Sequence, residues 1–588
     1  MNSIFNKKLF LGYISKINAG KTFVHIPSST YLSKFIYYGE KYHGGLLNSY
    51  VAIEGEHLGF IGRVNSAEIP EKERIELSSE AMKYNDFHPL LEVEILSEFD
   101  YCEIKFKKSV INLPNIGSKV YIANNNLVKR YFYQLEQEEF EKNKELKTCG
   151  FAKILSPNIE IDIDFSLQKL FSRHVAVVGT TGSGKSWTTS SLVINLLKSK
   201  HKAILIDATG EYSSLAEKWS TERNKVIIGE NFILSYRKLT IQDLFHLLTP
   251  APATQAPKLR EAIRSLKLLQ TNDPNLKEYI SDDGLTLIKS GRNREQLIKI
   301  FNKHSEVIST ENCNFDIRGL AAQIENECIW PNNKNDGTLF GGEDNNALGY
   351  CTSLITRIES LIKDEFYNKV FNFQQQIKLP DVIEALRTFL TEDKKCLFYI
   401  DISQVPFTFQ MREIVVDIIG QNLLDSARKG QFKNKPLTIF IDEAHQFLNK
   451  HINNDYEYKK LEAFENIAKE GRKYGLFLCI TTQLPRDIPT GVLSQIGTFI
   501  THRLINQRDK EIIMHSLPTM SSDVIKYLPT LGKGEAIISS SELADNLYIK
   551  INPPFIKPNS YTPLFLLNEN TSVMEASSQQ KSVEKLVF

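Results

Sequence analysis

A glycine-rich string at residues 179–186 carries the strongest chemical signal in the chain. It follows an apolar run, precedes a helical run, and has the spacing G-x-x-x-x-G-K-[ST]. Such glycines let backbone N–H groups converge on phosphate oxygens, and the helix N-terminus adds positive potential. The string predicts a site for ATP and Mg²⁺, with Lys185 on the β- and γ-phosphates and Ser186 on the metal. The candidate nucleotide-binding residues are Gly179, Thr180, Thr181, Gly182, Ser183, Gly184, Lys185, Ser186 and Trp187.

Two adjacent carboxylates, Asp442 and Glu443, directly follow the apolar run at 437–441. Doubly wound sheets expose their ligands at this carboxyl edge. We expect Asp442 to hold Mg²⁺ through water and Glu443 to polarise the attacking water. The same letters, ending at His445, occur in a helicase superfamily with two tandem motor folds. That assignment is rejected, because the chain has one phosphate loop, one sheet and no paired-arginine motif.

A third apolar run ends in Thr481, Thr482 and Gln483. Its position predicts polar groups beside the γ-phosphate, where the amide of Gln483 could sense hydrolysis. The alternative interpretation is a polar residue that begins a loop before Pro485.

The elements that must position these residues follow an α/β pattern from about residue 151. The pattern stops near Leu239, gives way to helical periodicity, and resumes at residue 396. This predicts a RecA-like ATPase core in two parts, 141–238 and 396–545, separated by a helical insertion at 239–395. Strands are expected at 174–179, 203–207, 396–402, 437–441, 477–481 and 498–503, with a helix at 186–199, a long exposed loop at 332–348 and a late edge strand at 535–539.

The first 140 residues are predicted to form a β-barrel or sandwich, because short β-branched and aromatic runs alternate with Gly, Asn and Pro. The charged stretch 136–147 suits a linker or an exposed helix. Residues 546–588 contain several prolines and are expected to form an extended C-terminal arm. The expected barrel strands cover 22–26, 50–53, 91–95 and 119–122.

Composition sets wider limits. A chain of 588 residues, 42% hydrophobic and 24% charged, is too long for one core and can pack several. The formal net charge of +1 is weak grounds against DNA binding, because a ring multiplies a few basic side chains. The seven cysteines contain no CxxC pair, so neither a disulfide framework nor a zinc site is indicated. Without a signal peptide or an eighteen-residue apolar run, we expect a cytoplasmic protein that does not enter membranes.

Four further strings complete a pattern that resembles the HerA branch of the HerA–FtsK translocases. The pattern departs from the family at Ala208-Thr209, where many relatives have Pro and His. The strings are Arg173-His174, Asp207-Ala-Thr-Gly-Glu211-Tyr212, Glu470-Gly-Arg472-Lys473-Tyr474-Gly475 and Leu531-Gly-Lys-Gly-Glu535-Ala.

The resemblance implies a homo-hexameric ring that binds ATP between subunits and passes double-stranded DNA through its centre. It implies that Arg472 is a finger on the neighbour's γ-phosphate, that Arg173 acts within its own subunit, and that Asp207 or Glu211 tunes metal and water. It also implies that the N-terminal barrel receives a partner nuclease or another effector protein, in DNA end processing or antiviral defence.

Two other functions stay open from the sequence. A polypeptide-moving secretion ATPase could use the same fold, and DNA-stimulated ATP hydrolysis would separate it from a DNA motor. A nucleotide-controlled scaffold ring that activates a partner effector would keep its function when Glu443 is lost.

Overall fold

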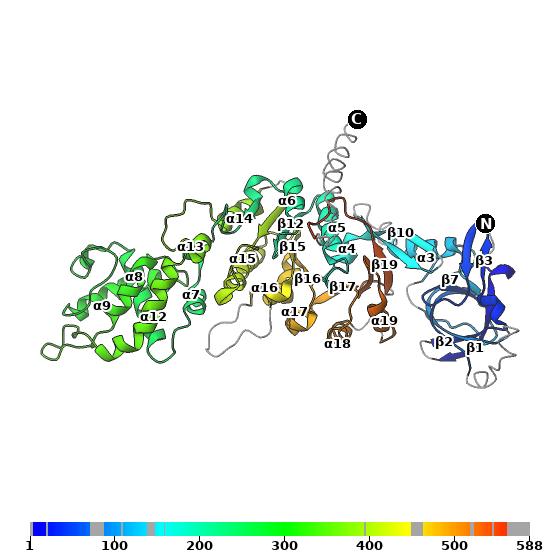
Figure 1. Ribbon diagram of the computed structural model, residues 1–588, viewed down its shortest axis with the longest axis horizontal. Helices are drawn as coiled ribbons and strands as arrows, with labels where there is room; N and C mark the ends of the chain where they lie inside the picture. The colour runs from blue at the N-terminus through cyan, green and yellow to red at the C-terminus, as the bar shows by residue number, and fades with distance from the viewer. Residues whose placement is uncertain are drawn as a thin grey trace, which may run out of the picture.

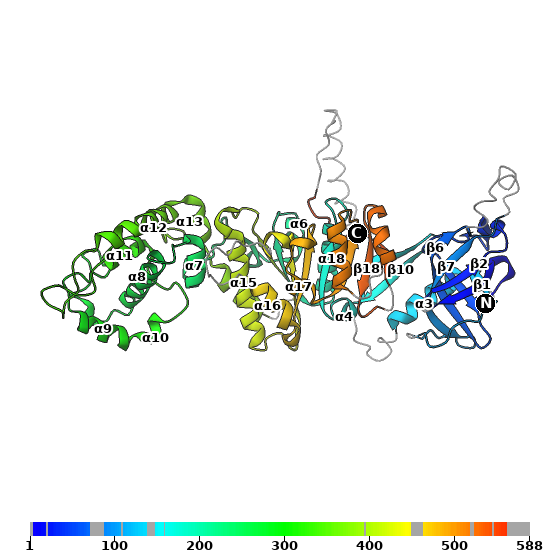
Figure 2. The ribbon, with the colours of Figure 1, turned by 90° about the horizontal axis from the view of Figure 1, so that it is seen from below.

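Three bodies follow one another along the long axis of the computed structural model, as both ribbon views show (Figures 1 and 2). The N-terminal barrel lies at one end, a large sheet with its helices in the middle, and a group of helices at the other end. This confirms the predicted fold class, an α/β core with an N-terminal barrel and a helical insertion. The domain limits stay predictions. The structure describes residues 4–18, 21–70, 87–107, 110–137, 148–157, 159–392, 396–448, 462–517, 522–543 and 546–560.

The barrel is a closed sheet of six strands in the order β1-β2-β7-β6-β5-β8. Alternate side chains point inward, so that Val24, Ile53 and Val93 meet in its core. A short hairpin of β3 (Lys34–Tyr37) and β4 (Glu40–His43) lies beside it. The barrel strands are β1 (Phe10–Asn18), β2 (Lys21–His25), β5 (Tyr50–Glu54), β6 (Leu58–Glu68), β7 (Leu90–Asp100) and β8 (Lys119–Ile122).

The central sheet has eleven strands in the order β10-β9-β19-β18-β17-β11-β16-β15-β12-β14-β13. The strands from β17 to β13 are parallel, and the others pair antiparallel. All the expected core strands and the expected helix are present, with ends shifted by at most two residues. The strands are β9 (Thr148–Ser156), β10 (Ile159–Ser166), β11 (His174–Val178), β12 (Lys202–Asp207), β13 (Lys225–Ile227), β14 (Leu397–Asp401), β15 (Leu437–Ile441), β16 (Leu476–Thr482), β17 (Ile496–His502), β18 (Glu535–Ser540) and β19 (Leu547–Ile551).

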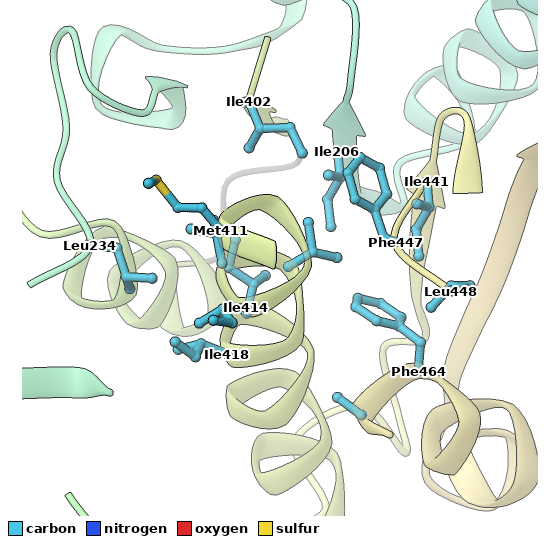
Figure 3. Close-up of a cluster of buried hydrophobic side chains, with 14 of the residues drawn as sticks. Ile206, Leu234, Ile402, Met411, Ile414, Ile418, Ile441, Phe447, Leu448 and Phe464 are labelled. Carbon is cyan, nitrogen blue, oxygen red and sulfur yellow. The ribbon is translucent and has the colours of Figure 1, made fainter. Parts of the chain in front are cut away.

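Helices cover both faces of this sheet, because alternate residues of each buried strand point to opposite sides. In β11, Val175 and Val177 pack with α5 and α6, whereas Ala176 and Val178 belong to the cluster on the α15 and α16 side. Figure 3 shows part of that second cluster, where side chains of α15, α16, β12 and β15 gather. The core helices are α4 (Leu167–Leu170), α5 (Lys185–Lys198), α6 (Ser213–Trp219), α15 (Met411–Arg428), α16 (Ala463–Glu470), α17 (Thr490–Leu493), α18 (Gln507–Ser516) and α19 (Ser522–Tyr527).

One end of the sheet differs from the sequence prediction. Residues 535–539 were expected at an edge, but β18 lies between β17 and β19. The edge lies farther out, because β19 and the hairpin of β9 and β10 add three antiparallel strands. Part of the predicted C-terminal arm is therefore a sheet strand. Residues 561–588 of that arm lie outside the described residues.

The helix α3 (Asn125–Gln137) joins the barrel to the sheet. Its Tyr131 and Phe132 share one apolar cluster with Phe99 of the barrel and Phe151 of β9. The buried Arg63 of β6 also donates from Nη1 to the carbonyl oxygen of Asn546 (2.8 Å). Most of the predicted linker, residues 138–147, lies outside the described residues, and residues 136 and 137 belong to α3.

The insertion between β13 and β14 is helical, as predicted. Polar caps begin several of its helices, including a capping box at Thr240 and an Asp344 side chain that accepts from two backbone N–H groups. The predicted loop 332–348 ends earlier, because α12 already begins at Asn345. The helices are α7 (Ile241–Leu248), α8 (Gln255–Leu269), α9 (Arg294–Lys303), α10 (Ser305–Ile308), α11 (Leu320–Glu327), α12 (Asn345–Lys363), α13 (Glu365–Phe371) and α14 (Val382–Thr391).

Within the described part of the chain, none of the helices combines the length and the apolar character needed to cross a lipid bilayer.

Candidate nucleotide-binding site

The predicted phosphate loop connects the end of β11 to the start of α5, as the motif requires. Gly182 and Gly184 have φ values of 72° and 122°, which side chains rarely adopt. Lys185 is buried, and its Nζ donates to the carbonyl oxygen of Thr180 (3.1 Å) inside the loop. The half-buried Trp187 packs against the apolar cluster between α5 and the sheet. The loop therefore folds back on itself, and the ammonium group of Lys185 is bound by a carbonyl oxygen of the loop.

The carboxylates Asp442 and Glu443 leave the carboxyl end of β15 on the same sheet edge as the loop. Asp442 is buried and accepts from the Tyr212 hydroxyl at Oδ1 (3.4 Å). Glu443 is 9% exposed and has a left-handed backbone, with φ 45°. A non-glycine residue in that region is strained, which is common where a catalytic side chain is held in place.

A chain of hydrogen bonds links the phosphate loop to Glu443. The Thr181 hydroxyl donates to Gln483 Oε1 (2.5 Å), and Gln483 Nε2 donates to Glu443 Oε1 (2.5 Å). The other oxygen of Glu443 is buried, accepts no hydrogen bond and lies 3.4 Å from His445 Nδ1. One Glu443 oxygen is therefore held in place, while the second is buried and accepts no hydrogen bond. The structure brings Gln483 into the site, as its interpretation as a sensor requires.

The charges in the site are unbalanced. Burial lowers the pKa of Lys185, and the nearby carboxylates of Glu443, Asp442 and Glu211 act in the opposite direction. Burial, followed by Asp207, Glu443 and Glu211, raises the pKa of Asp442 well above its usual range. Several buried carboxylates surround one ammonium group. A cation in the site would relieve this repulsion.

Oxygen donors fit a magnesium ion in this place. Among the described residues there is no cluster of three or more His, Cys, Asp or Glu side chains arranged to hold a metal alone. Magnesium commonly uses only one or two side chains together with phosphates and water. The hydroxyl of Ser186 donates to Glu211 Oε2 (3.0 Å), so that Ser186, Glu211 and Asp442 form an oxygen-rich group beside the loop.

Asp207 holds the turn after β12, and its predicted role in tuning metal and water stays a prediction. Its carboxylate accepts from the backbone N–H groups of Thr209 (3.0 Å), Gly210 (2.8 Å) and Tyr212 (2.9 Å), and from the Tyr399 hydroxyl (2.9 Å). These bonds use both oxygens to hold the turn after β12. Glu211, the other candidate, is the residue that faces Ser186.

The two predicted arginines lie at the opposite edge of the sheet from the phosphate loop. Arg173 directly precedes β11, and Arg472 lies in the 3-10 turn Gly471–Tyr474 that precedes β16. Both side chains are exposed. Strands of five and seven residues rise about 3.3 Å per residue, so each arginine is roughly 15–25 Å from its own phosphate loop. Arg173 is thus not adjacent to its own phosphate loop in this chain, and its action within its own subunit stays a prediction. The prediction that Arg472 acts on a neighbour is compatible with this placement.

The residues that support the phosphate loop from below were not predicted from the sequence. The fully buried His502 at the end of β17 has Nε2 2.8 Å from the Thr188 hydroxyl, and Nδ1 donates to the Glu535 carbonyl (2.9 Å). Gly534 donates from its N–H to the carbonyl oxygen of Ser183 (2.8 Å). A Cβ added at Gly184 would lie 3.1 Å from the Gly534 Cα. The sequence signal for this support was the Gly-Lys-Gly string at 532–534. Its Gly534 lies directly against the phosphate loop.

Fold and site together define a P-loop ATPase, an ATP-hydrolysing enzyme with a RecA-like sheet. Residues 153–358 match the family model of the helicase HerA central domain, and residues 426–560 match that of the helicase HerA-like C-terminal domain. The two matches together span more than half of the chain. The chain belongs to the HerA family of the HerA–FtsK superfamily.

Curated relatives include a probable helicase of Methanocaldococcus jannaschii, 25% identical over 515 residues, which cover 84% of this chain and 83% of the relative. The DNA double-strand break repair helicase HerA of Pyrococcus furiosus is 25% identical over 397 residues, 66% of each chain. Among solved structures, the plasmid coupling protein TrwB with ADP and Mg²⁺ aligns with 75% of this chain and 95% of its own, at 13% identity and a TM-score of 0.42.

Proposed function

We propose that this protein is an ATP-driven motor that moves along double-stranded DNA as a homo-hexameric ring. The observation that carries the proposal is the separation of Arg173 and Arg472 from the phosphate loop, across one sheet. One copy holds the loop, the water-polarising carboxylate and the amide, but Arg173 and Arg472 precede their strands at the other edge of the sheet. A neighbouring copy that presents its arginine edge to the loop would complete the site.

Within each site, Lys185 binds the β- and γ-phosphates of ATP. Glu443 orients the attacking water and accepts its proton, through the oxygen that Gln483 leaves unbound. Ser186 and Asp442, with Glu211 beside them, would hold Mg²⁺. When bound, Mg²⁺ would neutralise charge on the phosphate oxygens.

Gln483 connects hydrolysis to motion in this proposal. Its amide contacts the phosphate loop through Thr181 and the base Glu443 on its other side. Loss of the γ-phosphate would change the hydrogen bonds available on both sides. The strand β16 runs from this residue back to the turn that holds Arg472, so one rigid element joins a subunit's own site to its neighbour's.

The choice of duplex DNA as the track rests on the family and on relatives named as DNA double-strand break repair helicases. We further propose that the motor acts in the cytoplasm with a partner nuclease or another effector, in DNA end processing or antiviral defence. The N-terminal barrel is the proposed docking site. Its hairpin exposes Ile36 (71%) and Tyr38 (75%) to solvent, which would suit contact with another protein.

Displacement of a third strand from a triplex on linear duplex DNA tests this function, because a moving ring strips that strand without unwinding the duplex. We expect displacement that requires ATP and Mg²⁺ and is lost in Glu443→Gln. The matched control is Glu465→Gln, a carboxylate on α16 that pairs with Lys469 (2.8 Å) and for which no role in the site is proposed. ATP hydrolysis without any displacement, by a sample that binds the duplex, would contradict a motor on DNA.

A further inference from the structure

The chain after β19 crosses the central domain as an extended segment, residues 552–560, named here the strap. Asn552 begins it with a backbone N–H that donates to the carbonyl oxygen of Phe151 in β9 (2.9 Å). The ring of Phe555 lies 4.0 Å from the ammonium of Lys218 on α6. The carbonyl oxygen of Lys557 accepts from the hydroxyl of Ser214 (3.1 Å). These contacts bind the strap to the sheet and along α6.

The strap ends on the turn that carries Glu211. The backbone N–H of Asn559 donates to the carbonyl oxygen of Glu211 (2.7 Å). Its side chain donates from Nδ2 to the hydroxyl of Ser213 (2.9 Å). The strap therefore contacts the active-site turn from outside.

One peptide unit of that turn is held from both sides. Its carbonyl oxygen belongs to Glu211 and accepts from Asn559, while its N–H belongs to Tyr212 and donates to Asp207 Oδ2 (2.9 Å). This peptide directly follows the Glu211 Cα, and Gly210 before it has φ 80°, a conformation that favours glycine. The two bonds fix the position of this peptide and of the Glu211 Cα beside it, the point from which the Glu211 side chain projects.

The Glu211 carboxylate, in turn, meets the predicted metal ligand. Its Oε2 accepts from the Ser186 hydroxyl (3.0 Å), and its charge is one of those that raise the pKa of Asp442. Burial raises the pKa of Glu211 itself, and the bond from Ser186 opposes that shift. A displaced Glu211 would change both the charge and the ligand arrangement on the magnesium side.

We propose that the strap is a positioning element for Glu211, so that Mg²⁺ binding in the ATPase site depends on the C-terminal segment being docked. The inference rests on the proposed ATPase site. It makes the Asn559 N–H a positioning group that acts through the Glu211 peptide. A protein that lifts the strap would weaken the magnesium site without touching the phosphate loop.

Asn559→Pro tests the proposal in the full chain, because proline removes the one N–H that the Glu211 carbonyl accepts. Asn559→Ala is the matched control, since it keeps the N–H and loses only the bond to Ser213. The measurement is the Mg²⁺ concentration that half-saturates tight binding of a fluorescent ADP, with binding in EDTA recorded alongside. Because the proline variant loses one hydrogen bond, its half-saturating Mg²⁺ concentration should increase about two- to tenfold. We expect no such increase for alanine, and unchanged binding in EDTA for both.

A double-variant cycle separates positioning from general destabilisation. If the strap acts through Glu211, Asn559→Pro adds nothing to the magnesium requirement of Glu211→Gln, whereas independent effects would add. Phe555→Ala is the second variant in case Asn559→Pro does not fold. It loosens the strap without altering the turn and should also increase the half-saturating Mg²⁺ concentration. Wild-type magnesium dependence in both strap variants, or an equal loss of binding in EDTA, would overturn the proposal. Failure of the wild-type chain to bind nucleotide would instead contradict the ATPase site itself.

Discussion

Replacement of Arg472 by alanine tests whether the ATPase site is shared between subunits. The side chain is exposed in the turn before β16, roughly 20 Å from the phosphate loop of its own chain. Its removal should therefore leave folding and ATP binding close to wild type, since exposed substitutions commonly change stability by about 0.5 kcal/mol or less. A loss of turnover would then have to arise at the neighbouring site.

The expected loss is large. An arginine that neutralises charge on the transferring phosphoryl group contributes about 10³–10⁵ in rate, or about 4–7 kcal/mol of transition-state stabilisation. Lys473→Ala is the matched control, because this adjacent lysine is exposed in the same turn. We expect Lys473→Ala to hydrolyse ATP at close to the wild-type rate and Arg472→Ala to fall by at least about a thousandfold.

Mixing supplies the decisive assay. An Arg472→Ala subunit keeps its own Glu443, and a Glu443→Gln subunit keeps its Arg472. In a mixed ring, the interface where these two intact groups meet is complete, so that some activity should return. No recovery in mixed rings, with subunit exchange shown by mass, would refute the placement of Arg472 in a neighbour's site.

Three further predictions follow from the site and the barrel. Lys185→Ala should abolish tight ATP binding, whereas Glu443→Gln should bind ATP and lose about 10²–10⁴ in turnover; equal loss of binding in both would contradict their separate roles. Burial lowers the pKa of His502 to about 4, so the fold keeps it neutral while the unfolded chain takes up a proton below pH 6.5. The free energy of unfolding should therefore fall as the pH drops from 6.5 towards 4, by about 2 kcal/mol at pH 5 from this group. The melting temperature of His502→Gln should then decrease less steeply with falling pH than that of the wild type. Equal pH dependence in the two proteins would contradict this prediction. Ile36→Lys with Tyr38→Lys should prevent co-purification of the partner without changing the mass of the ring, and retained partner would place docking elsewhere.

Local patterns predicted the parts of the site that lie within one strand and its turn. The string at 179–186 and the carboxylates at 442 and 443 appeared at the expected strand ends, because buried parallel strands are short apolar runs with polar residues at their carboxyl edge. Gln483 followed from the same reasoning. The hydrogen bonds that join Thr181, Gln483 and Glu443 did not, since they connect three separate segments.

The errors came from long-range arrangement. The hairpin of β9 and β10 and the strand β19 pair across hundreds of residues, so that no local period showed that residues 535–539 are interior. The prolines after residue 552 predicted an extended segment, but not that residues 552–560 dock on the Glu211 turn. The distance between Arg173 and the phosphate loop could have been predicted from the sequence, because Arg173 precedes β11 and the loop follows the other end of that strand.

The most direct test of the central claim is the ATPase rate of the full chain with and without linear duplex DNA, on a sample whose mass has been measured. We predict a ring of six 67.2 kDa chains whose ATP hydrolysis accelerates with duplex DNA and stops in Glu443→Gln. A ring that hydrolyses ATP at one rate, whatever the concentration or length of the DNA, would contradict a motor that moves along it.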